Sequence, residues 1–426
     1  MTLNPDQPYD ITVVGLGYIG LPTATFFASA GLNVYGYDIN PDLISTIRSG
    51  EAPFVEPGFE TLLSTSVSSG YLHVGTTLKP ASSYILAVPT PVKLDKGADT
   101  TYVLDAATSI APLLRGGELV VVESTCPPGL TEDVAGHILK KNPSLTLTPN
   151  QPNSLYVAHA PERVLPGKIM AEMAANDRIV GGVNPEATKR AQQLYKQFCT
   201  GEVLVTDSRT AEMTKLAENS FRDINIAFAN ELSLICDELN IDVWELISLA
   251  NRHPRVNILQ PGPGVGGHCI AVDPWFIVDA APKTAKLIRT GREVNDSKPQ
   301  RVLEKITEEV DKAKPISGLL SICLLGIAFK PDIDDLRGSP ALKIAEQVAS
   351  SFPNAEITIV EPNIEKLPDL LTSHRNVSKV QFEFGVRSAD VVVVLVDHTS
   401  FKQNIHLLSD HKHVIDTRGI LNHSGR

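Results

Sequence analysis

The sequence predicts an α/β protein with two doubly wound parallel sheets, joined by a long central helix and a helical connector. Strand-like and helix-like segments alternate in the first half of the 426 residues and again after Pro315. Such alternation is typical of parallel sheets with helices on both faces. Between the two regions lies a long stretch with few helix breakers. A chain of this length makes about three domains, and we expect them over residues 1–208, 209–314 and 315–426.

The first sheet is expected to begin with a βαβ unit. A β-rich run from Asp10 to Val14 leads into a glycine-rich turn and a helix that continues to Ala30, and a second strand covers Val34 to Tyr37. This order is that of a βαβ motif. Further strands are expected at Tyr84–Val88, Leu119–Glu123, Tyr156–His159 and Val203–Val205.

The central region is expected to be helical. Apolar residues recur through Thr210–Asn240, which predicts one helix about 45 Å long. A second helix is expected over Asp242–Asn251, followed by a loop rich in Pro and Gly, Pro254–Pro274. We interpret this region as a connector between the two α/β halves.

The α/β pattern returns in the last third of the chain and predicts a second, smaller sheet. Its expected elements are a helix over Pro340–Ser350 and strands at Ser321–Leu325, Glu356–Val360, Val391–Val396 and Val414–Ile415. Both sheets are thus expected to be Rossmann-like.

Composition narrows the class of partner. With 38 basic and 49 acidic residues the net charge is −11, which argues against general nucleic-acid binding. No apolar run approaches the ~20 residues of a membrane span, and the polar N-terminus lacks signal-peptide features. We therefore expect a cytoplasmic protein that binds neither nucleic acid nor membrane. The five cysteines are scattered without a CxxC pair, so reduced thiols are expected and neither a zinc site nor a disulfide framework is indicated.

A dinucleotide site is predicted at the first glycine-rich turn. Gly15, Gly17 and Gly20 fit G-x-G-x-x-G between a strand and a helix, and Asp38 ends the next strand. The glycines admit the pyrophosphate, and the acidic residue accepts hydrogen bonds from the ribose. Since no arginine follows Asp38 to bind a 2′-phosphate, NAD is favoured over NADP. Thr90 and Thr125 each follow a strand at this end of the sheet, and by spacing alone each is either a loop residue or a cofactor contact.

A reactive cysteine is a second candidate site, with alternatives open. Cys269 follows a flexible glycine-rich segment, although an isolated cysteine is more often a small buried hydrophobe. Lys215, Asn219 and Arg222 share one helix face, either as a functional set or as a solvated charged stripe. Likewise the Glu162–Arg163 pair, and the basic group of Arg252, His253 and Arg255, fit either a binding site or surface loops.

These motifs together resemble the UDP-glucose/GDP-mannose dehydrogenase family over nearly the whole chain. The resemblance is carried by the glycine motif at 15–20, by AEMTK with Glu218 and Asn219, by GGHC with Asp273, and by FKP at 329–331 with DDLR at 334–337 and Ser339-Pro340. The segments PERVLPG at 161–167 and NRHPRVN at 251–257 narrow it to members that oxidise UDP-N-acetyl-D-mannosamine to its uronate.

The resemblance implies a role for each matching position. The implied catalytic residues are Cys269 as nucleophile, Lys215 and Asn219 at the oxyanion, Asp273 at the activated water, and Glu162 and Thr125 near the reacting carbon and nicotinamide. The implied cofactor contacts are Gly15, Gly17, Tyr18, Ile19, Gly20, Asp38, Thr90, Thr125, Arg337 and Arg418. The implied substrate contacts are Arg163, Val164, Lys215, Asn219, Arg222, His253, Arg255, Gly266, Phe329 and Lys330. No metal is implied, and a homodimer or higher homo-oligomer is expected.

The expected chemistry is a four-electron oxidation of a sugar CH2OH to a carboxylate with two NAD. A thiolate adds to the intermediate aldehyde, the resulting thiohemiacetal gives up a hydride to become a thioester, and water cleaves the thioester. Alternatives are another family substrate (UDP-N-acetylglucosamine, UDP-glucose or GDP-mannose), a dehydrogenase that stops after one hydride, or a non-catalytic NAD or nucleotide-sugar binding module.

Overall fold

The computed structural model describes residues 9–93, 95–165, 167–267, 269–313, 315 and 318–421. It divides into two compact units, each of which is considered by itself. The first holds the described residues up to Glu218 together with Trp275–Pro282, and the second holds Asn219–Pro274 with the described residues from Lys283 onward.

The first unit is built on an eight-stranded sheet in the order β3-β2-β1-β4-β5-β6-β7-β8. Its strands are β1 (Tyr9–Val14), β2 (Val34–Tyr37), β3 (Leu72–Gly75), β4 (Ala81–Leu86), β5 (Leu119–Val122), β6 (Tyr156–His159), β7 (Arg178–Gly182) and β8 (Val203–Asp207). The first six strands follow the Rossmann order, which confirms the predicted class. One detail of the prediction is wrong, because β7 runs antiparallel to β6 and the sheet is therefore not wholly parallel.

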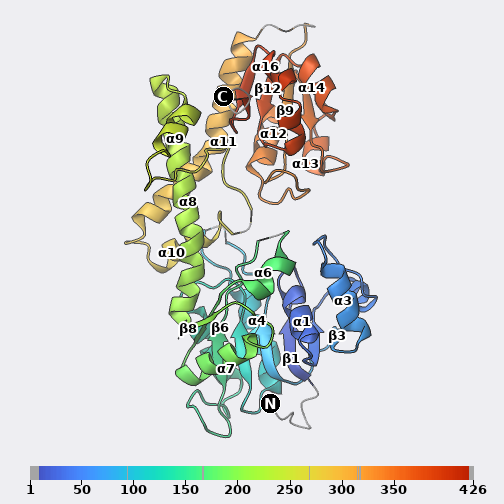
Figure 1. Ribbon diagram of the computed structural model, residues 1–426, viewed down its shortest axis with the longest axis vertical. Coiled ribbons are helices and arrows are strands. Elements are labelled where there is room, and N and C mark those ends of the chain that lie inside the picture. Colours follow the sequence, from blue (N-terminus) through green and yellow to red (C-terminus); the bar gives the residue numbers. More distant parts are fainter. Residues whose placement is uncertain are drawn as a thin grey trace. The chain divides into compact units, whose positions relative to one another are not determined.

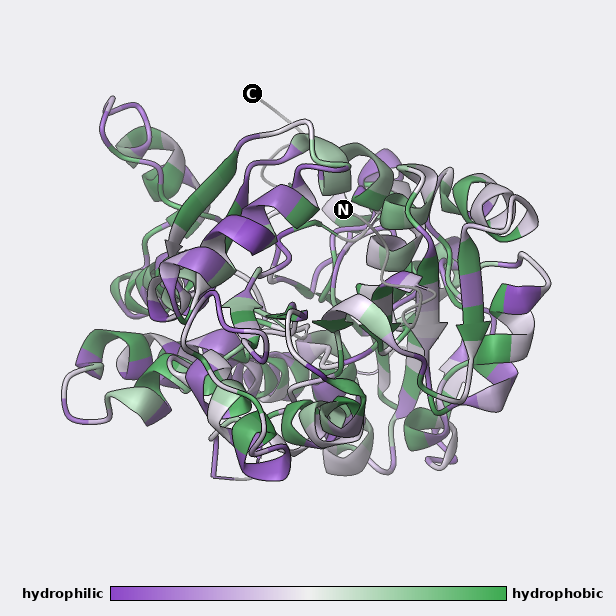
Figure 2. Ribbon diagram, turned by 90° about the horizontal axis from the view of Figure 1, so that it is seen from below, coloured by the Kyte–Doolittle hydropathy of each residue, from purple (hydrophilic) through white to green (hydrophobic). Residues whose placement is uncertain are grey.

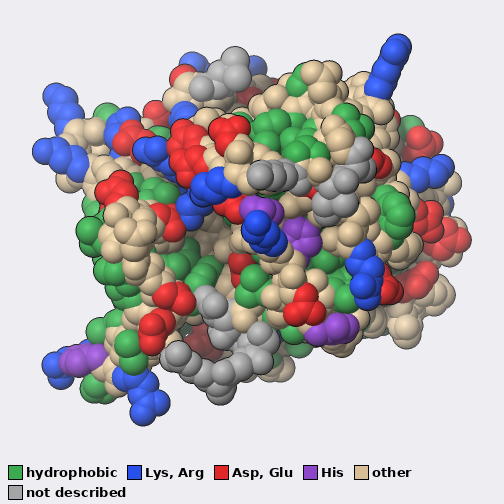
Figure 3. All heavy atoms as spheres, turned by 90° about the horizontal axis from the view of Figure 1, so that it is seen from above, with side chains coloured by type: hydrophobic (Ala, Val, Ile, Leu, Met, Phe, Trp, Pro, Cys, Tyr) green, Lys and Arg blue, Asp and Glu red, His purple; other side chains and the backbone are tan. Residues whose placement is uncertain are grey.

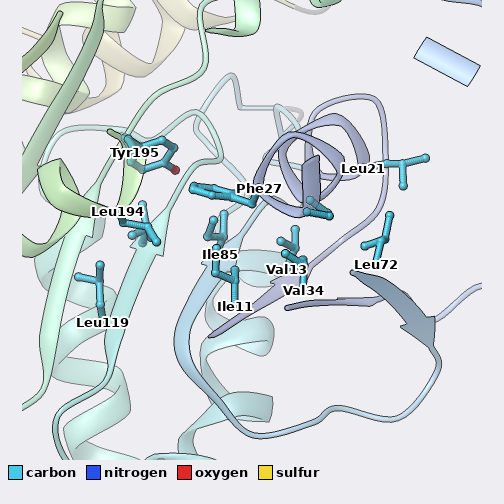
Figure 4. Close-up of a cluster of buried hydrophobic side chains, with 14 of the residues drawn as sticks. Ile11, Val13, Leu21, Phe27, Val34, Leu72, Ile85, Leu119, Leu194 and Tyr195 are labelled. Carbon is cyan, nitrogen blue, oxygen red and sulfur yellow. The ribbon is translucent and has the colours of Figure 1, made fainter. Parts of the chain in front are cut away.

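Helices flank this sheet (Figure 1). They are α1 (Gly20–Ser29), α2 (Pro41–Arg48), α3 (Phe59–Ser68), α4 (Thr101–Ile110), η1 (Ala111–Leu113), α5 (Leu130–Lys141), α6 (Ile169–Ala175) and α7 (Pro185–Tyr195). A further helix, α10 (Asp273–Ala280), belongs to this unit from Trp275 onward. Side chains on one face of the sheet pack against α1: Ile11, Val13, Val34 and Ile85 are buried with Phe27 in one core cluster (Figure 4). This alternation of inward-facing residues along β1 fixes the register of the strand and holds the glycine turn after Val14 at the end of a rigid strand.

The second unit contains the helical connector. Helix α8 (Ser208–Leu239) confirms the predicted long helix and crosses the boundary between the units, and α9 (Val243–Ala250) follows with Asp242 as its N-cap. A further long helix, α11 (Lys286–Lys312), packs on α8, where a Cβ on Gly291 would lie 3.3 Å from Ile224. The buried Asp223–Arg292 ion pair, at 2.6 Å, also joins the two helices.

The second sheet has five parallel strands in the order β11-β10-β9-β12-β13. Its elements are β9 (Ser321–Leu325), α12 (Pro340–Ser351), β10 (Glu356–Val360), α13 (Asp369–Thr372), β11 (Val377–Lys379), α14 (Phe382–Ser388), β12 (Val391–Val394), α15 (Thr399–Gln403), α16 (His406–Ser409) and β13 (Val414–Asp416). This confirms the second, smaller sheet of the Rossmann type. Several strands are predominantly hydrophobic (Figure 2), as strands covered on both faces should be.

Some expected boundaries are corrected. The strand predicted at Tyr84–Val88 begins at Ala81 and ends at Leu86, and β12 ends at Val394, two residues early. The loop predicted to continue to Pro274 gives way to α10 at Asp273. Strands β3, β7 and β11 were not expected.

Two surface properties bear on partners. On the face that Figure 3 shows, acidic and basic side chains are interspersed, so no general positive field extends over this face. Among the described helices, none combines the length and apolar character that a membrane crossing requires.

Candidate functional site

The glycine turn after β1 is shaped to accept a dinucleotide. Gly15 adopts a φ of +92°, which favours glycine, and a Cβ on Gly20 would lie 1.9 Å from the Gly15 carbonyl oxygen. In contrast, a Cβ on Gly17 would meet nothing within 4 Å. Two glycines are therefore needed for the turn itself, and the third leaves open space where a pyrophosphate can approach the backbone.

Asp38 is fixed at the end of β2, where a ribose would be recognised. Its Oδ2 accepts a hydrogen bond from the Leu16 amide (2.9 Å) and its Oδ1 accepts one from the Asn40 amide (2.9 Å). The side chain remains only partly buried, and each carboxylate oxygen has a second lone pair for a ribose hydroxyl.

The loops after β4 and β5 complete this edge. The Ser124 hydroxyl donates to the Val88 carbonyl oxygen at 2.6 Å and so joins the two loops. They carry Thr90 and the half-buried Thr125. The Thr90 hydroxyl oxygen is buried and has no hydrogen-bond partner among the described residues. Since a buried polar group without a partner destabilises the fold, a bound ligand is a reasonable partner for it. The residues present thus fit NAD.

We expect Gly17→Ala to separate cofactor binding from stability. The added methyl group meets no protein atom, so the free energy of unfolding should change by less than about 1 kcal/mol. It would occupy the pyrophosphate path, so the Kd for NAD should rise about tenfold or more. Fluorescence titration with NADH and thermal melting measure the two quantities.

Gly20→Ala is the matched comparison. Because its methyl group would overlap the Gly15 carbonyl oxygen, this variant should lose about 1–3 kcal/mol of stability. An unchanged NAD affinity in Gly17→Ala would contradict the assignment of the turn.

Tyr18 links the glycine turn to a second loop. Its hydroxyl bonds to Glu56 Oε2 at 2.8 Å, and Glu56 also accepts hydrogen bonds from the amides of Gly167 (2.9 Å) and Ile169 (2.8 Å). The residue before α1, Ile19, is its N-cap without a side-chain hydrogen bond. Tyr18, inferred as a cofactor contact, therefore also fastens the 162–169 loop to the dinucleotide site.

The segment after β6 is held by Glu162. Its Oε1 accepts hydrogen bonds from the amides of Arg163 (2.7 Å) and Val164 (3.1 Å), while its Oε2 pairs with Arg178 at 2.5 Å. The Arg163 guanidinium in turn pairs with Glu218 at 2.5 Å. Glu162 thus acts on the shape of its own loop as well as lying at the carboxyl end of the sheet.

The start of α8 is anchored so that Lys215 is placed on a rigid helix. Glu212 accepts hydrogen bonds from the Gly129 and Thr131 amides at 2.6 and 2.7 Å. Lys215 lies one turn further along, close enough to His159 for their charges to interact. Burial, opposed by the nearby Val122 carbonyl and helped by Lys215, lowers the pKa of His159 to about 3, so this imidazole is neutral beside the lysine.

In the second unit, Asn219 and Asp273 form a pair. Asn219 Nδ2 donates to Asp273 Oδ2 at 2.6 Å, and the buried Asp273 begins α10. The Asp273 amide donates to the Cys269 carbonyl oxygen at 2.8 Å. This bond ties the aspartate to the cysteine segment, so Asn219, Asp273 and Cys269 belong to one local structure.

Cys269 differs from the other cysteines, all of which are described. Its residue is exposed, while Cys126, Cys236 and Cys323 are buried and Cys199 is partly buried, and none forms a disulfide. Burial raises the pKa of the Cys126 and Cys323 thiols. Exposure and a cationic neighbour are what distinguish a reactive thiol from an inert one.

Lys330 supplies that cationic neighbour. Burial and the Arg222 guanidinium lower the pKa of Lys330, while the Cys269 thiolate raises it. By reciprocity, the ammonium stabilises the thiolate. The segment is kept in place by glycines: a Cβ on Gly267 would lie 3.2 Å from the Phe329 ring, and one on Gly266 would lie 2.5 Å from the Gly338 carbonyl oxygen.

The remaining inferred contacts lie at exposed or ion-paired positions. His253 and Arg255 are exposed after α9. Arg337 pairs with Asp335 at 2.7 Å, and Arg418 pairs with Asp397 at 2.8 Å and would meet a Cβ placed on Gly262.

The second sheet has an acidic strand end of its own. Glu361 follows β10 as Asp38 follows β2, and its Oε2 accepts hydrogen bonds from the Ile327 and Ala328 amides at 2.8 and 3.1 Å. However, the fully buried His398 ring lies 3.2 Å from the same oxygen, and its Nδ1 accepts a hydrogen bond from the Asp332 amide at 2.9 Å. The place in the second sheet that corresponds to the expected ribose position of the first is therefore occupied by the His398 side chain.

Among the described residues, no group of three or more His, Cys, Asp or Glu side chains is arranged to hold a metal ion. The glycine turn of the first unit has the features of a dinucleotide cradle, which is typical of an NAD-dependent dehydrogenase.

The chain belongs to the UDP-glucose/GDP-mannose dehydrogenase family. It matches the family's NAD-binding domain over residues 9–199, its central domain over 209–297 and its UDP-binding domain over 323–423. This confirms the resemblance inferred from the motifs, and NAD as the cofactor.

Relatives of known name are similar over nearly the full chain. The UDP-N-acetyl-D-mannosamine dehydrogenase of Escherichia coli K12 is 51% identical over 421 residues, 96% of this chain and 98% of its own. The NDP-N-acetyl-D-galactosaminuronic acid dehydrogenase of Ralstonia nicotianae is 50% identical over 413 residues, 96% of each chain. The solved UDP-N-acetyl-mannosamine dehydrogenase of Staphylococcus aureus has a TM-score of 0.84 at 40% identity, covering 97% of this chain and 96% of its own.

Several buried residues at these sites carry little or no signal in the local sequence pattern. Glu123, Arg178, Glu56 and His398 are buried ionisable groups whose partners are distant in sequence. An isolated charged residue within an apolar segment, as in the Val120–Glu123 run, is the one signal that would have indicated Glu123.

Proposed function

We propose that this protein is an NAD-dependent UDP-N-acetyl-D-mannosamine 6-dehydrogenase, which makes the corresponding uronate for surface polysaccharide synthesis. The observation that carries the proposal is the exposed Cys269, whose carbonyl oxygen accepts the Asp273 amide at 2.8 Å, in a chain half identical to enzymes of that name. The thiol supplies the nucleophile that a four-electron oxidation to the acid requires and that a two-electron alcohol dehydrogenase does not.

The proposed chemistry has four steps, and NAD, when bound, accepts a hydride in two of them. The sugar CH2OH loses a hydride and a proton to become an aldehyde. The Cys269 thiolate adds to the aldehyde to give a thiohemiacetal, which loses a second hydride to become a thioester. Water then cleaves the thioester to the carboxylate and frees the thiol. Lys215 and Asn219 donate hydrogen bonds to the oxyanion of each tetrahedral species. Asp273 takes the proton of the attacking water, and its hydrogen bond to Asn219 keeps that amide oriented.

Binding of the two ligands is proposed to be divided among the remaining site residues. Glu162 and Thr125 lie near the reacting carbon and nicotinamide, and Arg163, Val164 and His253 contact the sugar. Arg255 and Lys330 neutralise the diphosphate. Arg337 and Arg418 contact the cofactor. We propose three working domains over residues 1–208, 209–314 and 315–426, which the three family matches support, since each falls within one of them.

The test is an assay of NADH formation with UDP-N-acetyl-D-mannosamine, UDP-N-acetylgalactosamine, UDP-N-acetylglucosamine, UDP-glucose and GDP-mannose, with product mass. Two NADH per UDP-N-acetyl-D-mannosamine and a uronate product are expected. One NADH and an aldehyde would indicate a simple dehydrogenase, and binding without turnover would indicate a non-catalytic module. A preference for UDP-N-acetylgalactosamine is the second candidate, because a relative named NDP-N-acetyl-D-galactosaminuronic acid dehydrogenase is 50% identical.

We further propose a homodimer formed through α8, in a reducing, cytoplasmic compartment where the Cys269 thiol persists. One face of the helix carries four large apolar residues: Phe221, Phe228, Ile235 and Leu239. The first three are seven residues apart, and Leu239 lies five turns from Phe221. They are 72%, 50%, 44% and 61% exposed. A stripe of this kind marks an interaction site, and a second copy of α8 offers a matching apolar stripe.

Replacing Phe221 and Phe228 together by glutamate should convert the dimer to a monomer, because four like charges would meet at the seam. Sedimentation velocity measures the change. Phe384→Glu is the control, since Phe384 is 60% exposed on α14 and should leave the mass unchanged. A wild-type monomer at micromolar concentration would contradict the proposal.

A further inference from the structure

The antiparallel strand β7 has a functional consequence. Ala158 pairs with Gly182 and His159 with Gly181. Continued past the end of β6, this register places Arg178, the first residue of β7, opposite Glu162. In a strand parallel to β6, the first residue would lie at the amino end of β6. Because β7 is antiparallel to β6, the Arg178 guanidinium lies instead at the carboxyl end, where ligands bind in open α/β sheets.

Arg178 lies between two carboxylates at that edge. Its Nη2 is 2.5 Å from Glu162 Oε2 and its Nη1 is 3.4 Å from Glu123 Oε1. The three side chains are 4%, 7% and 0% exposed. Burial lowers the pKa of Arg178, but Glu162, Tyr195 and Glu123 more than offset this and raise it. Burial raises the pKa of Glu123 to about 7, against the opposing effect of Arg178. Two buried carboxylates that share one cation lose their charge compensation when that cation is removed, which is strongly destabilising.

Glu123 connects this ion group to the rigid core. Its Oε2 accepts a hydrogen bond from the Thr23 hydroxyl of α1 at 2.8 Å, and its Oε1 accepts one from the Tyr195 hydroxyl at 3.1 Å. The Arg178 guanidinium also lies 4.6 Å from the centroid of the Tyr195 ring. The arginine is therefore fixed by elements that do not belong to the loop it binds.

The loop itself is controlled by Glu162. One carboxylate oxygen of Glu162 accepts hydrogen bonds from the amides of Arg163 and Val164, and the other forms an ion pair with Arg178. In addition, the Arg163 guanidinium donates to the carbonyl oxygen of Asp177, the neighbour of Arg178. The backbone conformation of residues 162–164 therefore depends on the position of the Arg178 guanidinium.

We propose that Arg178 is a positioning residue for the sugar nucleotide, which fixes the Glu162–Val164 segment against Glu123 and so sets how tightly that substrate is held. The inference rests on the proposed function, because Arg163 and Val164 are substrate contacts only there. Arg178 acts through Glu162 and contacts neither substrate nor cofactor.

The test is Arg178→Lys with Arg190→Lys as the matched control. Arg190 stacks 3.7 Å from the Tyr156 ring centroid and donates to the Gly117 carbonyl oxygen, at the opposite edge of the same sheet. A lysine keeps the charge but cannot bind two carboxylates in a fork. We expect the KM and the calorimetric Kd for UDP-N-acetyl-D-mannosamine to rise about 10- to 100-fold, while the Kd for NAD stays within about twofold.

Arg190→Lys should leave all three constants unchanged. A folded Arg178→Lys enzyme with wild-type KM and Kd for the sugar nucleotide would overturn the proposal, as would an equal weakening of NAD binding. Should Arg178→Lys fail to fold, the double variant Arg178→Lys/Glu123→Gln is measured instead, since it leaves one carboxylate for the ammonium. Wild-type KM and Kd for the sugar nucleotide, or equally weakened NAD binding, would overturn the proposal for this variant as well. Wild-type protein that binds the sugar nucleotide without oxidising it would contradict only the proposed function, because the calorimetric comparison still tests Arg178.

Discussion

Replacing Cys269 by alanine should lower net oxidation of the sugar nucleotide by about three orders of magnitude or more. Without the thiol the aldehyde has no nucleophile in the site, so the second hydride cannot leave efficiently. Cys269→Ser should stall at a hemiacetal or lose net turnover, because a hydroxyl is a far weaker nucleophile than a thiolate. NADH release and product mass under single-turnover conditions measure the effect.

Cys236→Ala is the control for the loss of a thiol, since Cys236 is buried in α8 and should leave turnover unchanged. Iodoacetamide gives an independent readout. Because Cys269 is the exposed member of the five cysteines, all of which are described, it should be alkylated first, and UDP-N-acetyl-D-mannosamine should protect it. Uronate formation by Cys269→Ala at an ordinary rate would refute the mechanism.

Lys215→Met should have the second largest effect, a fall in kcat of about 100- to 1,000-fold, or about 2.7–4 kcal/mol of barrier. The ammonium is proposed to donate to an oxygen whose negative charge grows toward the transition state, so its loss acts on kcat more than on binding. Methionine keeps most of the side-chain length, and the helix it lies on is anchored separately by Glu212.

Arg209→Met is the matched control on α8, because it removes a cation whose partner is the exposed Glu132 at 2.7 Å. An exposed ion pair contributes little, so kcat should be unchanged. A Lys215→Met enzyme with a normal kcat and a raised KM would show that the lysine binds the ground state only, and would remove it from the oxyanion role.

The parts of the fold that were predicted are those in which local pattern and tertiary environment agree. The strand, glycine turn, helix and acidic strand end around Gly15 and Asp38 follow from short-range sequence, since each glycine answers a local steric need. Helix α8 is long and lacks breakers, so its limits were predicted within two residues.

The parts that were not predicted depend on distant contacts. Strand β7 reads Arg-Ile-Val-Gly-Gly, too short and too rich in glycine for a strand pattern, yet a Cβ on Gly181 would lie 2.1 Å from the Asp207 carbonyl oxygen. Helix α11 contains Gly291 and Pro299, which normally argue against a helix. Gly291 is explained by its close approach to α8, which no local pattern reveals.

The same reason explains which site residues were found. Cys269 and Lys215 lie in motifs of characteristic order, but the roles of Arg178 and Glu123 exist only because 55 residues of chain fold back on themselves. Burying a charge costs desolvation free energy, which an oppositely charged partner offsets. Here that partner is distant in sequence, so only the three-dimensional structure identifies it.

The filled strand end of the second sheet has a consequence for the order of events. Since His398 lies against Glu361, the described residues offer one dinucleotide cradle, the turn around Gly15, whereas the proposed mechanism removes two hydrides from each sugar. Under that mechanism the cradle must be emptied and refilled midway through a catalytic cycle. An aldehyde held only by reversible contacts would escape during this exchange, so the proposed bond to sulfur would also retain the intermediate until the second oxidation.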